Sequence, residues 1–73
     1  MREEIENLKI EYKELKEKYK NFIEIFDSPK FNLLLYEQKH WIRKQAEVME
    51  EYLKILKKRI RLETQLENEE NYI

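Results

Sequence analysis

Polar side chains with the right chemistry for a ligand site recur at a fixed interval in the second half of the chain. Four of them are spaced seven residues apart: Gln38, Gln45, Tyr52 and Arg59. On a helix, this spacing keeps side chains close to one line. Glutamine both donates and accepts hydrogen bonds, tyrosine stacks on a base, and arginine offers a planar fork suited to phosphate. This polar stripe is therefore a candidate site for a nucleotide-like ligand.

Apolar residues border the polar stripe on both sides. One flank holds Ile42, Ala46, Met49, Leu53, Leu56 and Ile60, and the other holds Leu34, Trp41, Val48, Ile55 and Leu62. The stripe thus runs through a wide apolar arc where burial is expected, and a buried polar group without a partner costs about 1–3 kcal/mol. Either the stripe fixes the register and number of packed helices, or it lines pockets between subunits.

Trp41 borders the same stripe and has two interpretations of its own. It is either a core or interface anchor, or a stacking surface for a ligand. The candidate ligand-binding residues are therefore Gln38, Trp41, Gln45, Tyr52 and Arg59.

The residues that precede the polar stripe in the chain predict another amphipathic helix. Apolar residues recur at alternating intervals of three and four: Ile5, Leu8, Tyr12, Leu15, Tyr19, Phe22 and Phe26. This heptad pattern predicts a helix over about residues 2–26. Ser28 and Pro29 favour a new helix start, which places a turn at 27–28 and a second helix at about 29–66. The acidic tail at 67–73 is expected to fray.

The predicted fold is all-α, a single domain over residues 1–73 formed by an antiparallel two-helix hairpin with unequal helices. Folding back at 27–28, the first helix would reach only to about residue 53 of the second. Four apolar residues would then have no partner in their own chain: Ile55, Leu56, Ile60 and Leu62. Burying each contributes about 1.5–3 kcal/mol, so we expect the hairpin to assemble into a homo-oligomeric helical bundle.

Composition excludes several classes of function. The chain has no cysteine and one histidine, so we expect no disulfide, no metal site and no cofactor. No nucleophile stands beside a histidine and no glycine-rich loop is present, so we expect no enzyme. The basic cluster at 54–61 is flanked by acidic residues and the net charge is −1, so nucleic acid is an unlikely partner. No signal peptide or membrane-length apolar run is visible, and we expect a cytoplasmic protein without a membrane partner.

A set of residues over about 12–62 resembles a family of very short helical-hairpin proteins of tailed bacteriophages, including crAss-like phages. The resemblance is carried by Glu14-Leu15, Phe22-Ile23, Ser28, Phe31, Glu37-Gln38, Gln45, Met49, Tyr52, Leu56 and Arg59-Ile60. This chain departs from the family in having Leu34-Leu35 where a Leu-Pro often stands, and in a longer connection between Phe22 and Phe31. The resemblance implies a phage origin and hence the host cytoplasm. It also implies an anti-defence role, in which oligomers hold the nucleotide signals of CBASS or Thoeris immunity without cleaving them.

Three functions follow as hypotheses. The first is a homo-oligomer that sequesters a cyclic nucleotide or an ADP-ribose-derived signal through the polar stripe. The second is a protein-interaction or scaffold module in which the stripe only sets register. The third is nucleic-acid binding through the basic cluster, which would weaken steeply with salt.

Overall fold

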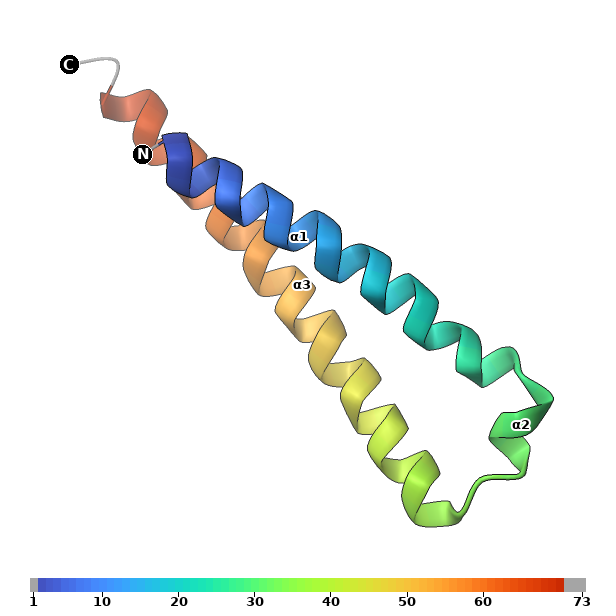
Figure 1. Ribbon diagram of the computed structural model, residues 1–73. Helices are drawn as coiled ribbons and strands as arrows, with labels where there is room; N and C mark the ends of the chain where they lie inside the picture. The colour runs from blue at the N-terminus through green and yellow to red at the C-terminus, as the bar shows by residue number, and fades with distance from the viewer. Residues whose placement is uncertain (1, 71–73) are drawn as a thin grey trace.

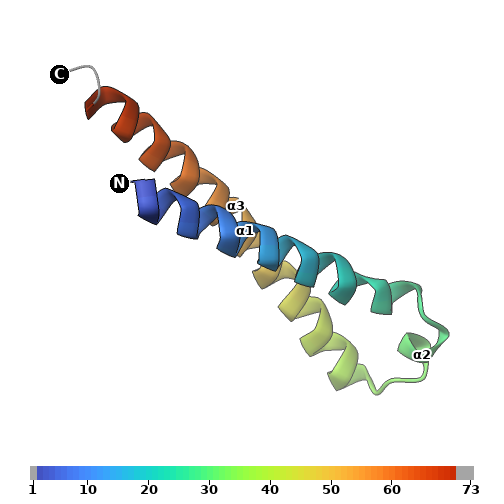
Figure 2. The same cartoon turned by 45° about the horizontal axis from the view of Figure 1, so that its top comes forward.

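Two long antiparallel helices make up most of the computed structural model, which describes residues 2–70 and the side chains of 2–69. The elements are α1 (Arg2–Ile23), the 3₁₀ helix η1 (Glu24–Asp27), the short α2 (Pro29–Asn32) and α3 (Tyr36–Glu70). Helices α1 and α3 run side by side, and the start of α1 lies next to the last turns of α3 (Figures 1 and 2). The predicted all-α hairpin with unequal helices is confirmed.

The contact between α1 and α3 is a narrow apolar seam. Ile5 and Leu8 of α1 are buried, and Leu56 of α3 has no exposed surface. Ile42, Met49 and Leu53 of α3 are half-buried along the same line. These residues follow the heptad pattern of α1 and one flank of the polar stripe, so periodicity alone locates the core.

The connection between the long helices has a small core of its own. The Ser28 hydroxyl accepts a hydrogen bond from the Lys30 backbone N–H at 3.3 Å and caps α2. Phe31 is buried, and its ring meets Phe26 edge-on with centroids 5.1 Å apart. The Lys39 ammonium and the Arg43 guanidinium lie 5.6 and 5.3 Å from the Phe31 centroid. Apolar and cation–π contacts at Phe31 thus tie the turn to the first turns of α3.

The second long helix begins later than predicted, at Tyr36 instead of about residue 29. The predicted start at Ser28-Pro29 initiates only α2, which ends at Asn32. The described part of α3 also continues to Glu70, where fraying from residue 67 was expected. Residues 71–73 lie outside the described residues.

This late start corrects the length argument for oligomerisation. Because residues 24–35 all belong to the connection, α1 pairs with a more C-terminal part of α3 than a two-residue turn would allow. The Arg2 Nε lies 3.8 Å from a Glu67 carboxylate oxygen, and Leu56 is fully buried. The prediction that α1 reaches only to the level of about residue 53 of the second helix is therefore wrong. Leu56 and Ile60 have partners within the chain.

The hairpin is long and thin, with principal extents of 59 × 16 × 14 Å. Its described residues form two long helices packed on each other, joined by the short η1 and α2, and no third long helix of the described chain covers them. A body this thin has no interior in which a ligand could be enclosed. Among the described helices, none combines the length and apolar character that crossing a membrane requires.

Candidate functional site

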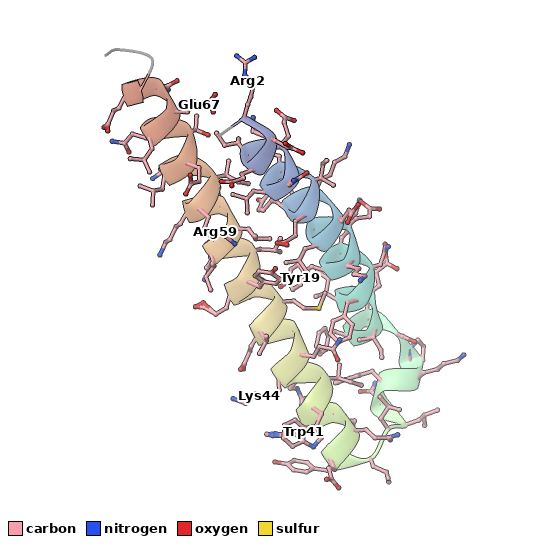
Figure 3. All side chains as sticks on the ribbon, turned by 60° about the vertical axis from the view of Figure 1, so that its left-hand side comes forward. Arg2, Tyr19, Trp41, Lys44, Arg59 and Glu67 are labelled. Atoms are coloured by element: carbon pink, nitrogen blue, oxygen red, sulfur yellow. The ribbon has the colours of Figure 1, made fainter. Side chains whose placement is uncertain are left out.

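One half of the predicted apolar arc stays exposed on the single hairpin. Trp41, Val48, Ile55 and Leu62 retain 60%, 65%, 52% and 53% of their surface. We call these four residues the α3 ridge. Figure 3 shows Trp41 on the α3 side of the hairpin, away from the seam with α1. The argument from helix length fails, but the argument from the width of the apolar arc holds, because α1 leaves these four side chains uncovered.

The polar stripe lies between this ridge and the seam with α1, and it is exposed instead of buried. Gln38, Gln45 and Arg59 are exposed, and Tyr52 keeps 41% of its surface. The described residues include no buried polar or charged side chain. The expected burial is thus wrong for the isolated hairpin, because α1 covers only one edge of the arc.

Gln38 caps the N-terminus of α3. Its Oε1 accepts a hydrogen bond from the Leu35 backbone N–H at 2.8 Å. Leu35 precedes the first helical residue and Gln38 is the third residue of the helix, which is the position from which Glu or Gln reaches back in a capping box. Gln38 therefore has a local structural role.

Replacing Gln38 tests the cap directly. We expect Gln38→Ala to lower the free energy of unfolding by about 0.3–1.5 kcal/mol, because the Leu35 N–H loses its partner. Gln38→Glu should keep the stability, since a carboxylate accepts the same hydrogen bond and suits a helix N-terminus. Thermal unfolding followed by circular dichroism measures both. Equal losses in the two variants would contradict the capping role.

Tyr52 links the two long helices. Its hydroxyl donates a hydrogen bond to a Glu11 carboxylate oxygen at 2.8 Å. This hydrogen bond, with burial and the charge of Glu11, raises the pKa of the Tyr52 phenol above its ordinary value of 10.0, while Arg59 acts in the opposite direction. Tyr52 is thus held by α1 at one edge of the polar stripe.

The Tyr52 contact predicts a dependence of stability on alkaline pH. Since the pKa is higher in the folded chain than in the unfolded chain, the stabilisation is complete below pH about 10. It is lost as the pH rises through the higher folded pKa. We expect the melting temperature of the native chain to fall more between pH 9 and 11.5 than that of Tyr52→Phe. All other groups are the same in the two chains, so the difference isolates Tyr52, and parallel curves would contradict the prediction.

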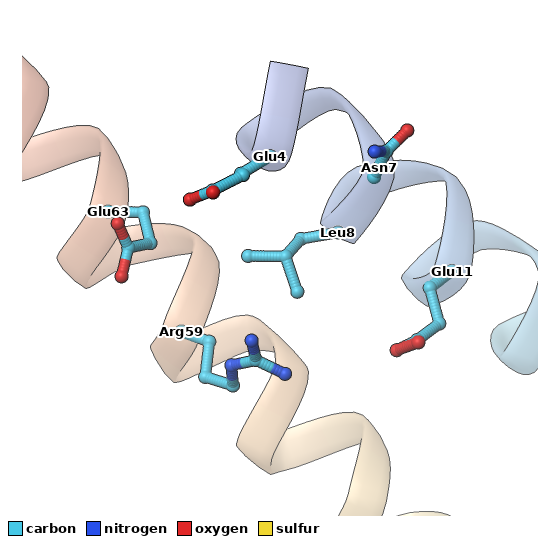
Figure 4. Close-up of a pocket in the computed structure, with 6 residues that line it drawn as sticks. All are labelled: Glu4, Asn7, Leu8, Glu11, Arg59 and Glu63. Carbon is cyan, nitrogen blue, oxygen red and sulfur yellow. The ribbon is translucent and has the colours of Figure 1, made fainter. Parts of the chain in front are cut away.

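Arg59 lies among carboxylates contributed by both helices. A surface pocket of about 260 Å³ is lined by Glu4, Asn7, Leu8, Glu11, Arg59 and Glu63. Figure 4 shows the guanidinium between α3 and α1, with Glu63 and Glu11 on either side of it. With three carboxylates and one guanidinium the pocket has a formal charge of −2, so a phosphate is electrostatically disfavoured there.

Gln45 and Trp41 are the stripe and ridge residues most available to a ligand. In the part of the chain that the structure describes, the Gln45 amide makes no hydrogen bond, and it is exposed. The Trp41 indole lies edge-to-face with the ring of the neighbouring His40, with ring centroids 4.9 Å apart. A large aromatic ring that is 60% exposed offers a face for stacking.

Sequence reasoning missed the acidic side chains that face the stripe. Glu4 and Glu11 flank the buried Leu8 on α1 and are spaced seven apart, which indicates that they follow the seam. Four residues of the basic cluster at 54–61 line a second hollow of about 250 Å³ on α3: Lys54, Lys57, Lys58 and Arg61. The stripe and this basic surface are separate on the helix. The described residues hold no group of three or more potential metal ligands.

A family model described as Sequestin matches residues 3–62, which include α1, the connection and most of α3. No curated protein and no solved structure matches the chain. The matched range contains all five candidate ligand-binding residues.

Proposed function

We infer the function from the premise that this chain belongs to the Sequestin family: it binds a small molecule and holds it without converting it. The family name denotes sequestration, and the exposed Trp41 and Gln45 provide surface that a ligand could occupy. The observation that carries the proposal is the family match over both long helices.

The ligand site is proposed to lie between copies of the chain. The described residues of one chain form a hairpin of only two long helices, whereas small-molecule sites bury most of their ligand's surface. The α3 ridge leaves four apolar side chains exposed next to the polar stripe. Covering the ridge with further copies would place stripe residues on the walls of a cleft, so we propose a homo-oligomer.

The proposed ligand is a nucleotide-derived immune signal, either a cyclic nucleotide or an ADP-ribose derivative. Trp41 would stack on the base, and Gln45 would read its polar edges. Gln38, Tyr52 and Arg59 complete the candidate set, although each of them already contacts or faces other groups of its own chain. The resemblance to small phage proteins supports a phage-encoded protein that disarms CBASS or Thoeris signalling in the host cytoplasm.

Isothermal titration calorimetry against a panel of cyclic dinucleotides and ADP-ribose derivatives tests this function. We expect at least one signal to bind with a stoichiometry set by the oligomer. The released ligand should be chemically unchanged when it is recovered from the heat-denatured complex by chromatography. A panel without binding at high micromolar concentration, together with a stoichiometric protein partner from host lysate, would favour the scaffold alternative.

A further inference from the structure

The surface next to the α3 ridge carries alternating charges. Glu37, Lys44, Glu51 and Lys58 are spaced seven apart along α3, and all four are exposed. On a helix they form one row that borders the ridge on the side opposite to the polar stripe. We call these four residues the charged row. Its signs run minus, plus, minus, plus from the N-terminal end of α3.

Such a row is complementary to itself only when it is reversed. If a second copy lies antiparallel with its two-fold axis near Val48, Glu37 faces Lys58 of the second copy and Lys44 faces its Glu51. Both pairs occur twice by symmetry, so four favourable pairings form. The two-fold axis is perpendicular to the α3 helices. It therefore keeps each row on the same side of the interface, and each row meets the same row of the other copy.

The same axis also pairs the ridge with itself. Val48 meets Val48 of the second copy, and Trp41 meets its Ile55. At the same register Leu62 lies level with residues 33–35 of the second copy, where Leu33 and Leu35 are 84% and 71% exposed. The arrangement therefore accounts for exposed leucines in the turn as well as for the ridge.

A parallel pairing of the two α3 helices is less favourable. A two-fold axis along the helices would bring the charged row of one copy beside the polar stripe of the other. Lys58 would then lie beside Arg59 of the second copy, twice by symmetry, and like charges repel. Trp41 would meet Trp41, and the turn leucines would have no apolar residue of α3 at their level.

We propose that a second copy of this chain packs antiparallel along the α3 ridge, with the two-fold axis near Val48, and so completes the ligand site. In this register the polar stripe also meets itself, with Gln45 beside Tyr52 of the second copy and Gln38 beside its Arg59. Each cleft then holds residues from both chains. The ligand site between the copies rests on the proposed function. The pairing of the two copies does not, since it requires no ligand.

Disulfide cross-linking tests the arrangement, and the chain's lack of cysteine makes the background clean. A disulfide requires Cα atoms within about 7 Å. We expect Val48→Cys alone to form a cross-linked dimer under mild oxidation. Ile55→Cys alone should not, because its two copies would lie 14 residues apart in register, or about 21 Å at 1.5 Å per residue. An equimolar mixture of Trp41→Cys and Ile55→Cys chains should cross-link as a heterodimer.

Self-cross-linking of Ile55→Cys would overturn the antiparallel arrangement in favour of the parallel one. Failure of Val48→Cys to cross-link, with a monomer in light scattering at micromolar concentration, would overturn the pairing altogether. These experiments contain no nucleotide, so they fail independently of the proposed function. Calorimetry on the native chain reports on the ligand whichever arrangement is found.

Charge reversal provides a second test that leaves the apolar ridge intact. Lys44→Glu should weaken dimerisation about two- to fivefold for each pair that it breaks, as expected for exposed ion pairs. The double variant Lys44→Glu/Glu51→Lys should restore the native dissociation constant, because the pairs reform with reversed sign. Lys44 also lies 3.6 Å from Glu47 of its own chain, and Glu47→Gln controls for loss of that contact. A double variant that dimerises no better than Lys44→Glu would contradict the pairing of residues 44 and 51.

Discussion

Replacing Leu56 by alanine is expected to lower the free energy of unfolding by about 2–5 kcal/mol. Leu56 is the one described side chain with no exposed surface, and it lies in the seam between α1 and α3. Its removal leaves a cavity that two helices alone can hardly refill. A 73-residue chain with so small a core has little stability in reserve, so we expect Leu56→Ala to be largely unfolded at 37 °C.

Leu33→Ala is the matched control for this prediction. It makes the same chemical change in the same chain, but Leu33 is 84% exposed in the connection. In the monomer its effect should stay within about 0.5 kcal/mol, the usual range for surface positions, so the comparison uses chains dilute enough that the proposed contact of Leu33 with a second copy is not formed. Urea titration followed by circular dichroism, at a concentration where the control is native, compares the two. Equal midpoints for Leu56→Ala and Leu33→Ala would show that the seam does not hold the hairpin together.

The helices and their packed faces could be predicted from the sequence because both signals are local. The three-four spacing from Ile5 to Phe26 marks one face of α1, and the absence of glycine leaves few helix breakers. The flank of the stripe that contains Leu56 was likewise predicted as apolar and packs on α1. Periodicity identifies which side of a helix is buried without reference to any distant residue.

The register of the hairpin could not be predicted in the same way. The register depends on the length of the connection. Ser28-Pro29 marks the start of a helix but not how long that helix is. In the structure Phe31 packs against Phe26, α2 ends at Asn32 and α3 begins at Tyr36, and no residue spacing in the sequence marks a connection of this length. A shift of several residues then placed Leu56, which was predicted at an unpaired end, in the buried seam with α1.

The sequence predicted which residues make up the candidate site, but not which groups their side chains contact. The seven-residue spacing of the stripe was readable, whereas the partners of its members were not. Gln38 bonds its own backbone neighbour, Tyr52 bonds Glu11, and Arg59 shares a pocket with three glutamates. Two of these contacts involve α1, and a pairing across helices depends on the register that the connection sets.

Replacing Trp41 by alanine is expected to cause the largest loss of ligand affinity. Stacking of one base on an aromatic side chain contributes about 1–3 kcal/mol, which corresponds to roughly a 5- to 150-fold increase in the dissociation constant. Trp41→Phe should recover much of this loss because it keeps an aromatic face. Trp41 is the sole tryptophan in the chain, so quenching of its fluorescence on addition of the signal gives a second, independent readout for the native protein.

Trp41 also belongs to the α3 ridge, and the measurement must separate stacking from dimerisation. We would make the substitution in the Val48→Cys background, in which a disulfide holds two copies together regardless of the ridge. If Trp41 stacks on the ligand, the locked dimer with Trp41→Ala still binds 5- to 150-fold more weakly than the locked dimer with Trp41. If locking restores full affinity, Trp41 is only an anchor between copies, and Gln45 with its neighbours in the second chain must account for the recognition of the ligand.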